Sequence, residues 1–310
     1  MGLKLVSVQM MLPALLETRA KPGARILLLG TQDLYFTYSQ ALVFLRGLGV
    51  EVVEVPQAER RTTNSFAYVP HGDWWRHKDF LHQETFFRML GFGADQLDTL
   101  DVSGFEQANI IHDMNLPLPP GMGTYELVVD AGTLEHVFDQ RQALWNLADL
   151  VAVGGQAVHV MPANMLDHGF YNYSSTLLAD FYRQAGWAQV DLHYLASPMA
   201  ETGQDTLYLK IAPGALGAPP GGFWFGLFGR FRKLEGAGHP IVAQGLYEAL
   251  HDAWTRTSRA ESQHEAPPPR PGDGWRCLVA RLRAKLAFAR ARRQAARIPG
   301  EMVVLREPPH

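Results

Sequence analysis

Small and acidic residues follow the ends of several apolar runs in this 310-residue chain. Gly30 ends one such run, and Asp101, Asp113 and Asp130 end three later ones. If these runs are strands of one parallel sheet, their carboxyl ends lie along one edge, where open α/β sheets bind ligands. A carboxylate held there can accept two ribose hydroxyls or an adenine amino group. The ordered set therefore predicts a nucleoside-containing ligand, although each acid alone also fits a helix N-cap or a turn.

The elements that would position these residues alternate between apolar strands and helices. This alternation predicts a doubly wound, mostly parallel α/β sheet. The expected strands cover residues 25–30, 98–101, 109–113, 125–130, 156–161, 187–195 and 205–212. The expected helices cover residues 3–18, 37–48, 80–90, 139–152 and 174–185. Residues 50–55 are another candidate for the second strand, and Glu54 would then take the place of Asp101 at its end.

Four segments carry a resemblance to a known family: residues 111–119, residues 125–138 with Gly-Thr-Leu-Glu-His, Gly154-Gly155, and residues 168–174 with His-Gly-Phe-Tyr-Asn-Tyr-Ser. Together they resemble bacterial class I S-adenosylmethionine-dependent methyltransferases, over residues 20–212. The resemblance implies a seven-stranded sheet with a reversed last hairpin. It also implies S-adenosylmethionine as co-substrate or sole substrate.

The resemblance further implies how the cofactor is held. The residues concerned are Gly30, Thr31 and Gln32 in the first loop, Asp101 with Val102 at the ribose, Asp113 or its neighbour His112 at the adenine, and Asp130, Ala131, Gly132 and Thr133 beside the methionine part. The family has several glycines in the first loop, whereas this chain has only Gly30. Gln32 and Asp33 are therefore candidates to bind the ammonium group. Glu54 remains the alternative ribose ligand; Asp101 is preferred because it lies just before the Ile111 segment.

The residues expected to act in the reaction follow two of the strands. A sulfonium carbon is attacked in line with the departing sulfur, so the protein mainly supplies positioning and a dry site. Tyr171 and Tyr173, with Phe170, could form an aromatic wall for the cation or simply pack beneath their loop. His136 and His168, followed by Glu135, are candidate proton acceptors, and Glu135-His136 is also explained as a helix start.

Several other kinds of site are not expected. The histidines considered as metal ligands, His112, His136, His159 and His168, lack a His-Glu-x-x-His or comparable spacing, so no metal is predicted. The chain also lacks a Gly-x-Ser-x-Gly elbow and a phosphate-binding Gly-x-x-x-x-Gly-Lys-Ser/Thr loop. Serine hydrolase and P-loop nucleotide hydrolase functions therefore lose support.

Composition narrows the class of protein. The net charge of −3 gives no global attraction to nucleic acid or to an acidic membrane. A single cysteine, Cys277, excludes an intrachain disulfide and a multi-cysteine zinc site, so a cytoplasmic protein is expected. Neither a transmembrane helix nor a myristoylation signal is expected, and the apolar residues 3–16 are interrupted by Gln9 and Pro13, unlike a signal peptide.

Three regions are expected along the chain: an N-terminal helix within residues 1–24 that packs on the rest or closes over it, an α/β domain at 25–212 with an insertion at 56–90, and a Pro/Gly linker with a helical extension at 213–310. The extension contains expected helices at 241–256 and 275–297. The second is rich in arginine and is read as a solvated, docked helix. The apolar residues 223–228 are expected to dock on the core, cap the site or form a homodimer contact.

The sequence thus predicts in-line methyl transfer from S-adenosylmethionine to a small molecule, of the kind used in secondary metabolism. One alternative is a cyclase in which the amine of S-adenosylmethionine attacks its own γ-carbon and gives azetidine-2-carboxylic acid and methylthioadenosine. The other is a catalytically silent module that only binds the cofactor.

Overall fold

The computed structural model describes residues 2–62, 79–198, 207–213, 223–245 and 301–304. The expected arginine-rich helix at 275–297, most of the expected helix at 241–256 and most of the 213–222 linker lie outside these residues, as does Cys277. Within the described residues, no helix has both the length and the apolarity needed to cross a membrane.

One mixed sheet organises the described chain, with strands in the order β3-β2-β1-β4-β5-β8-β6-β7-β9. The strands are β1 (Ile26–Leu29), β2 (Leu97–Asp101), β3 (Ile110–Ile111), β4 (Tyr125–Ala131), β5 (Val151–Pro162), β6 (Trp187–Pro198), β7 (Leu207–Ile211), β8 (Phe223–Lys233) and β9 (Glu301–Val304). Strands β1 to β5 pair in parallel, whereas β8 runs antiparallel between β5 and β6. In sheet order, the strands from β3 to β6 confirm the expected seven-stranded sheet with a reversed last hairpin.

Two parts of the predicted sheet need correction. Residues 223–228 were expected to dock on the core, cap the site or form a homodimer contact. They begin β8, an interior strand, so the sheet extends beyond residue 212. The predicted strand at 205–212 is β7, which pairs outside β6 and is followed at the edge by β9, so the sheet has nine strands rather than seven. The sequence of this aromatic, apolar segment does not indicate its pairing partners, because pairing between distant strands is decided by tertiary structure.

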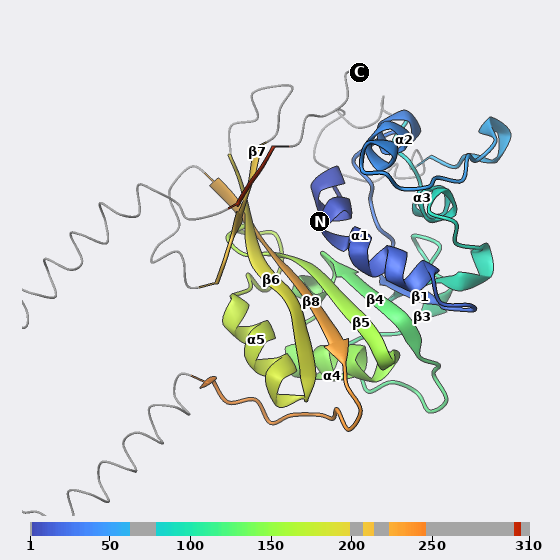
Figure 1. The fold of residues 1–310 in the computed structure, drawn as a ribbon. Helices are drawn as coiled ribbons and strands as arrows, with labels where there is room; N and C mark the ends of the chain where they lie inside the picture. Colours follow the sequence, from blue (N-terminus) through green and yellow to red (C-terminus); the bar gives the residue numbers. More distant parts are fainter. Residues whose placement is uncertain (1, 63–78, 199–206, 214–222, 246–300, 305–310) are drawn as a thin grey trace, which may run out of the picture.

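Helices cover both faces of the sheet (Figure 1). On one face lie α1 (Leu5–Arg19), α2 (Tyr38–Gly47) and α3 (Gln83–Met89); on the other lie α4 (Gln140–Leu150) and α5 (Ser175–Gln184). Strand β1 serves both layers, because Ile26 and Leu28 pack on the first side and Leu27 and Leu29 on the second. A strand buried on both faces requires such a continuous apolar run.

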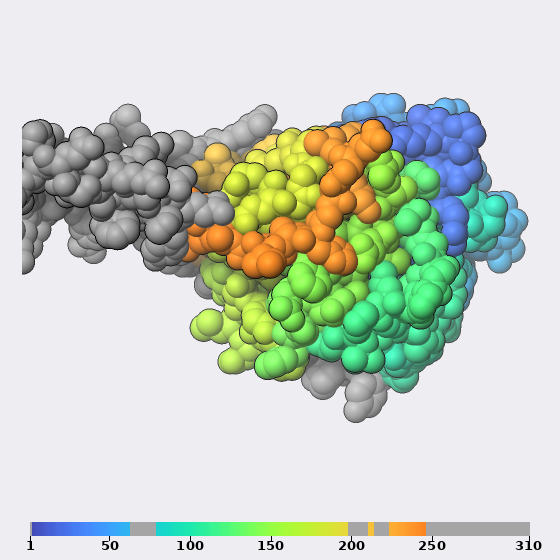
Figure 2. Space-filling view, turned by 90° about the horizontal axis from the view of Figure 1, so that it is seen from below, coloured from blue at the N-terminus to red at the C-terminus, as the bar shows by residue number. Residues whose placement is uncertain are grey.

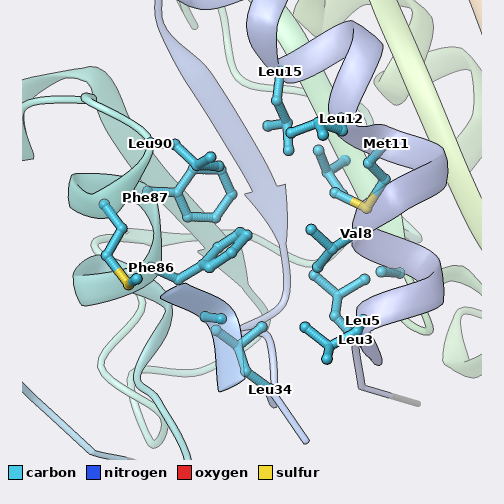
Figure 3. Packing of buried hydrophobic residues seen from close by; sticks show 14 of the residues in the cluster. Leu3, Leu5, Val8, Met11, Leu12, Leu15, Leu34, Phe86, Phe87 and Leu90 are labelled. Atoms are coloured by element: carbon cyan, nitrogen blue, oxygen red, sulfur yellow. The ribbon is translucent and has the colours of Figure 1, made fainter. Parts of the chain in front are cut away.

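The N-terminal helix is a fixed part of the first layer. Val8, Met11 and Leu15 of α1 lie in the same buried cluster as Phe86 and Phe87 of α3 (Figure 3). At its far end, Glu17 accepts two hydrogen bonds of 2.7 Å from the guanidinium of Arg232 on β8. This helix was expected either to pack on the rest of the chain or to close over it, and in the structure it packs on the domain.

The segment after β8 runs across the outer surface of α4 and α5 (Figure 2, orange). His239 hydrogen-bonds Asp149 at 2.8 Å and stacks on Trp145, and the amide of Gly245 donates to Asp180 at 3.0 Å. Residues 234–245 therefore belong to the α/β domain, on the face away from α1.

Candidate functional site

The loop after β1 is held between the ends of β2 and β4. Gly30 has a φ of +71°, a conformation that favours glycine, and its amide donates to the carbonyl of Leu100 at 2.8 Å. A Cβ at this position would lie 2.7 Å from Oγ1 of Thr133, whose hydroxyl donates to the carbonyl of Leu29 at 2.5 Å. Gly30 and Thr133, both predicted site residues, are thus brought into direct contact.

Hydrogen bonds from Thr31 and Gln32 hold this loop in place. The Thr31 hydroxyl donates to the backbone carbonyl of Glu106 at 2.9 Å. The side-chain amide of the buried Gln32 donates to the carbonyls of Leu29 and Gly30, and the backbone amide of Gln32 donates to Gln83 Oε1. The Gln32 Oε1 atom is buried without a hydrogen-bond partner, which leaves an acceptor for a ligand donor.

Three carboxyl groups lie around the ends of β1 and β2. Burial raises the pKa of Glu106 to about 6, and the neighbouring Asp33 and Asp101 add to the effect. Burial also raises the pKa of Asp33. Like charges held together in partly buried positions are unfavourable unless a cation joins them, so this group of acids suits a positively charged ligand.

Asp101 is the acid that ends the second strand of the sheet. Its Oδ1 accepts a hydrogen bond from the amide of Ser103 at 3.1 Å. Residues 50–55 are not a strand, and Glu54 forms an exposed ion pair with Arg46 beside α2. Of the two candidate ribose ligands, only Asp101 lies at the edge of the sheet that carries Gly30.

The predicted adenine-facing residues follow β3. The amide of His112 donates to the carbonyl of Asp101 at 2.9 Å, and its ring Nε2 lies 3.1 Å from the carbonyl of Leu116. Asp113 Oδ1 accepts from the amide and the side chain of Asn115, and these bonds lower the pKa of Asp113. Val102 is 65 % exposed just after Asp101. These residues share one edge, although Asp113 already stabilises its own turn.

Asp130 has a different environment from the other strand-end acids. Its fully buried carboxylate accepts from the amides of Thr133 and Leu134 and lies 2.8 Å from Nδ1 of His159. The Nε2 atom of His159 is 2.7 Å from the hydroxyl of Tyr182. This chain of hydrogen bonds engages the Asp130 carboxylate inside the core, and the position of residues 130–133 beside the methionine part stays a prediction. Ala131 is buried too, which leaves Gly132 and Thr133 of this segment closest to the loop.

Glu135, His136 and His168 come together beside the end of β4. Glu135 and His136 lie in the 3₁₀ turn η4 (Leu134–His136), and His168 lies in the loop after β5. The Nε2 atom of His168 is 3.4 Å from Glu135 Oε1, and that of His136 is 4.0 Å from the same oxygen. Burial, together with Asp130, raises the pKa of Glu135 to about 7, and burial lowers the pKa of both histidines.

The predicted aromatic wall forms only in part. Tyr173 is buried in the core, where its hydroxyl donates to Gln140 Oε1 at 2.7 Å, so it packs beneath the loop. Tyr171 donates to the carbonyl of Phe138 at 2.8 Å. The rings of Phe138 and Phe170 are both exposed and meet edge to face with centroids 5.7 Å apart. Phe138 therefore joins Phe170 and Tyr171 on the accessible side of the loop.

Two residues of this edge, Gln83 and Glu106, were not predicted from the sequence. Gln83 lies in the segment predicted as an insertion, and only the tertiary fold brings it to Gln32. Glu106 follows Asp101 by five positions, and its position in a loop after a strand could have marked it. Glu135 was considered only as a proton acceptor, because its contact with His168 spans 33 positions of sequence.

Comparison with known proteins returns solved structures only: no family model and no curated protein matches the chain. TehB from Haemophilus influenzae is 14 % identical with a TM-score of 0.31, and the match covers 48 % of this chain and 52 % of that one. This chain thus spans about half of TehB. NodS, an N-methyltransferase from Bradyrhizobium japonicum WM9 in complex with S-adenosyl-L-homocysteine, is 17 % identical with a TM-score of 0.29, and the match covers 48 % of this chain and 72 % of that one.

A third similar structure covers more of the chain. It is the 1,6-didemethyltoxoflavin-N1-methyltransferase of Burkholderia thailandensis, at 11 % identity and a TM-score of 0.35, with 74 % of this chain and 80 % of that one covered. All three values of identity and TM-score are low, so the fold assignment rests on the strand order and on the reversed β8. That sheet, with β1 to β5 in parallel and β8 reversed between β5 and β6, is of the kind expected from the resemblance to class I methyltransferases.

Proposed function

We propose that this protein transfers a methyl group from S-adenosylmethionine to a small molecule. The observation that carries the proposal is the meeting of Gly30, Asp101 and His112 along one edge of the parallel sheet. The amide of Gly30 bonds to β2, and the amide of His112 bonds to Asp101, so the ends of β1, β2 and β3 form one continuous polar edge.

The residues present fit the cofactor part by part. The carboxylate of Asp101 is suited to the ribose hydroxyls, and the turn at His112 and Asp113 borders the place of the adenine. The unpartnered Gln32 Oε1, with Asp33 and Glu106, is suited to an ammonium group, which carries N–H donors and positive charge. Gly30 and Thr133, which are in contact at the end of β1, border the place proposed for the methionine part.

When bound, S-adenosylmethionine supplies an electrophilic methyl group on a sulfonium. The protein then has to hold an acceptor in line with the bond that breaks and to exclude water. The exposed rings of Phe138 and Phe170 offer an apolar surface for such an acceptor. The cluster of Glu135, His136 and His168 lies on the same side of β4, and we assign to it the removal of a proton from an acceptor that starts protonated.

The test is mass spectrometry of the full chain incubated with S-adenosylmethionine, alone and with a panel of small-molecule acceptors that carry hydroxyl, amine or thiol groups. The proposal predicts S-adenosylhomocysteine together with an acceptor heavier by one methylene. Methylthioadenosine formed without any acceptor would identify the cyclase instead. Tight binding without turnover across the whole panel would favour the silent module.

A further inference from the structure

The cluster of Glu135, His136 and His168 contains a buried carboxylate that has no donor. The Glu135 side chain is 0 % exposed, and neither of its oxygens has a hydrogen-bond partner. The Nε2 atom of His168 also lacks a partner. Leaving a buried polar atom without a partner costs about 1–3 kcal/mol, and more when it is charged. Such a group needs a compensating ligand when it is ionised.

The chain holds these three residues close together by its backbone. The amide of Phe170 donates to the carbonyl of Glu135 at 2.8 Å, which ties the His168 loop to η4. A Cβ at Gly169 would lie 2.8 Å from that carbonyl oxygen and 2.9 Å from Glu135 Cγ, so only glycine allows this approach. Asp167, just before His168, has a φ of +57°. The arrangement therefore depends on specific local geometry on both sides of His168.

The distances match those between ligands of one metal ion. One ligand atom from each residue lies within 4.8 Å of the other two, and the separation from His168 Nε2 to Glu135 Oε1 is 3.4 Å. Zinc binds imidazole nitrogen and carboxylate oxygen at about 2.0–2.2 Å, which sets tetrahedral ligands about 3.4 Å apart. The two imidazole rings meet edge to face with centroids 5.4 Å apart, so small side-chain rotations would close the remaining distances.

We propose that Glu135, His136 and His168 form a binding site for one divalent transition metal ion. Two imidazoles and one carboxylate are donors that zinc, manganese and iron(II) accept, whereas magnesium and calcium favour oxygen donors alone. Three protein ligands leave at least one coordination position for water or for an oxygen or nitrogen of an acceptor.

This site differs from His159, the buried histidine of β5. His159 is already hydrogen-bonded on both nitrogens, to Asp130 and to Tyr182, and has no capacity for an ion. The proposed ligands show no metal-binding spacing in the sequence, because two are adjacent and the third comes from the loop after the next strand. The inference is independent of methyl transfer, since metal binding is measured without S-adenosylmethionine.

The experiment is a calorimetric titration of the chelator-treated full chain with Zn²⁺, and in parallel an absorption titration with Co²⁺. A Cys277→Ser background removes the sole thiol. The variants are Glu135→Gln, His136→Gln and His168→Gln, with His239→Gln as control, because His239 also pairs with a carboxylate, that of Asp149, but on α4 rather than beside the end of β4. Circular dichroism of the metal-free variants checks that each is folded.

The proposal predicts one ion per chain, a thermal midpoint raised by the metal, and affinity reduced by more than about tenfold in each of the three variants but not in His239→Gln. Absence of stoichiometric binding would overturn it. So would binding that all three variants retain, or a site that takes Mg²⁺ in preference to Zn²⁺ and Co²⁺. If one variant fails to fold, the other two and the metal-dependent thermal shift decide the outcome.

Discussion

The hydroxyl of Thr133 lies 2.5 Å from the carbonyl of Leu29 and occupies the space that a side chain at residue 30 would need. This contact joins the end of β4 to the end of β1. It explains why glycine stands at the first position of the loop and why Gly-Thr appears in the segment after β4. The loop is shaped by a partner 103 positions away in sequence rather than by a series of glycines.

Replacing Gly30 with alanine tests this contact. The new Cβ would be strained at a φ of +71° and would meet Thr133, so we expect a loss of about 2–4 kcal/mol in the free energy of unfolding. Gly49→Ala is the matched control, because Gly49 has a φ of +73° but nothing within 4 Å of the added carbon. Its expected loss is about 1 kcal/mol. Equal losses in the two variants, measured by chemical denaturation, would show that the Thr133 contact is unimportant.

Asp101 is expected to carry much of the affinity for the ribose. Asp101→Asn keeps the shape but removes the charge-assisted hydrogen bonds, so calorimetry should show S-adenosylhomocysteine binding weakened about tenfold to a hundredfold. Glu54→Gln is the control, since Glu54 lies outside the sheet in an exposed ion pair. A strong loss in Glu54→Gln with unchanged binding in Asp101→Asn would reverse the assignment.

The buried chain Asp130–His159–Tyr182 is expected to stabilise the fold rather than bind ligand. Tyr182→Phe leaves Nε2 of His159 without its partner in a fully buried position, which should cost about 1–3 kcal/mol. Tyr171→Phe removes a hydroxyl whose bond to Phe138 is accessible to water, so it should cost less than about 0.5 kcal/mol. Thermal and chemical unfolding measure both. Similar stability of Tyr182→Phe and the unmodified protein would contradict this role.

From the raised pKa of Glu106 we expect the stability of the ligand-free protein to depend on pH. Its pKa is about 6 in the folded protein, above the ordinary 4.5, because of burial and of Asp33 and Asp101. Between these values the folded state binds more protons than the unfolded state, so the free energy of unfolding falls as the pH rises. We expect the protein to lose about 1 kcal/mol relative to Glu106→Gln between pH 4.5 and 7. Parallel stability curves for the two proteins would refute the assignment.

Much of the fold follows from the sequence, and the reasons are local. The run Ile26–Leu29 is apolar on both faces, and a capping box at Thr37 begins α2. Each signal lies within the element that it predicts, so no distant residue is needed to recognise it. The place of β8 could not be predicted in this way, because it pairs with β5 and β6 across the linker. The candidate site likewise has residues that the sequence predicts and residues whose orientation depends on distant parts of the chain. Asp101 is readable as a strand end, whereas the inward orientation of Asp130 depends on His159 and Tyr182, which are distant in sequence.

The central claim is that the edge formed by Gly30, Asp101 and His112 binds S-adenosylmethionine. Calorimetric titration of the full chain with S-adenosylhomocysteine, repeated with Asp101→Asn, tests it most directly. The account predicts one molecule bound per chain and a marked loss of affinity in the variant. Absence of binding, or binding that Asp101→Asn leaves unchanged, would contradict it.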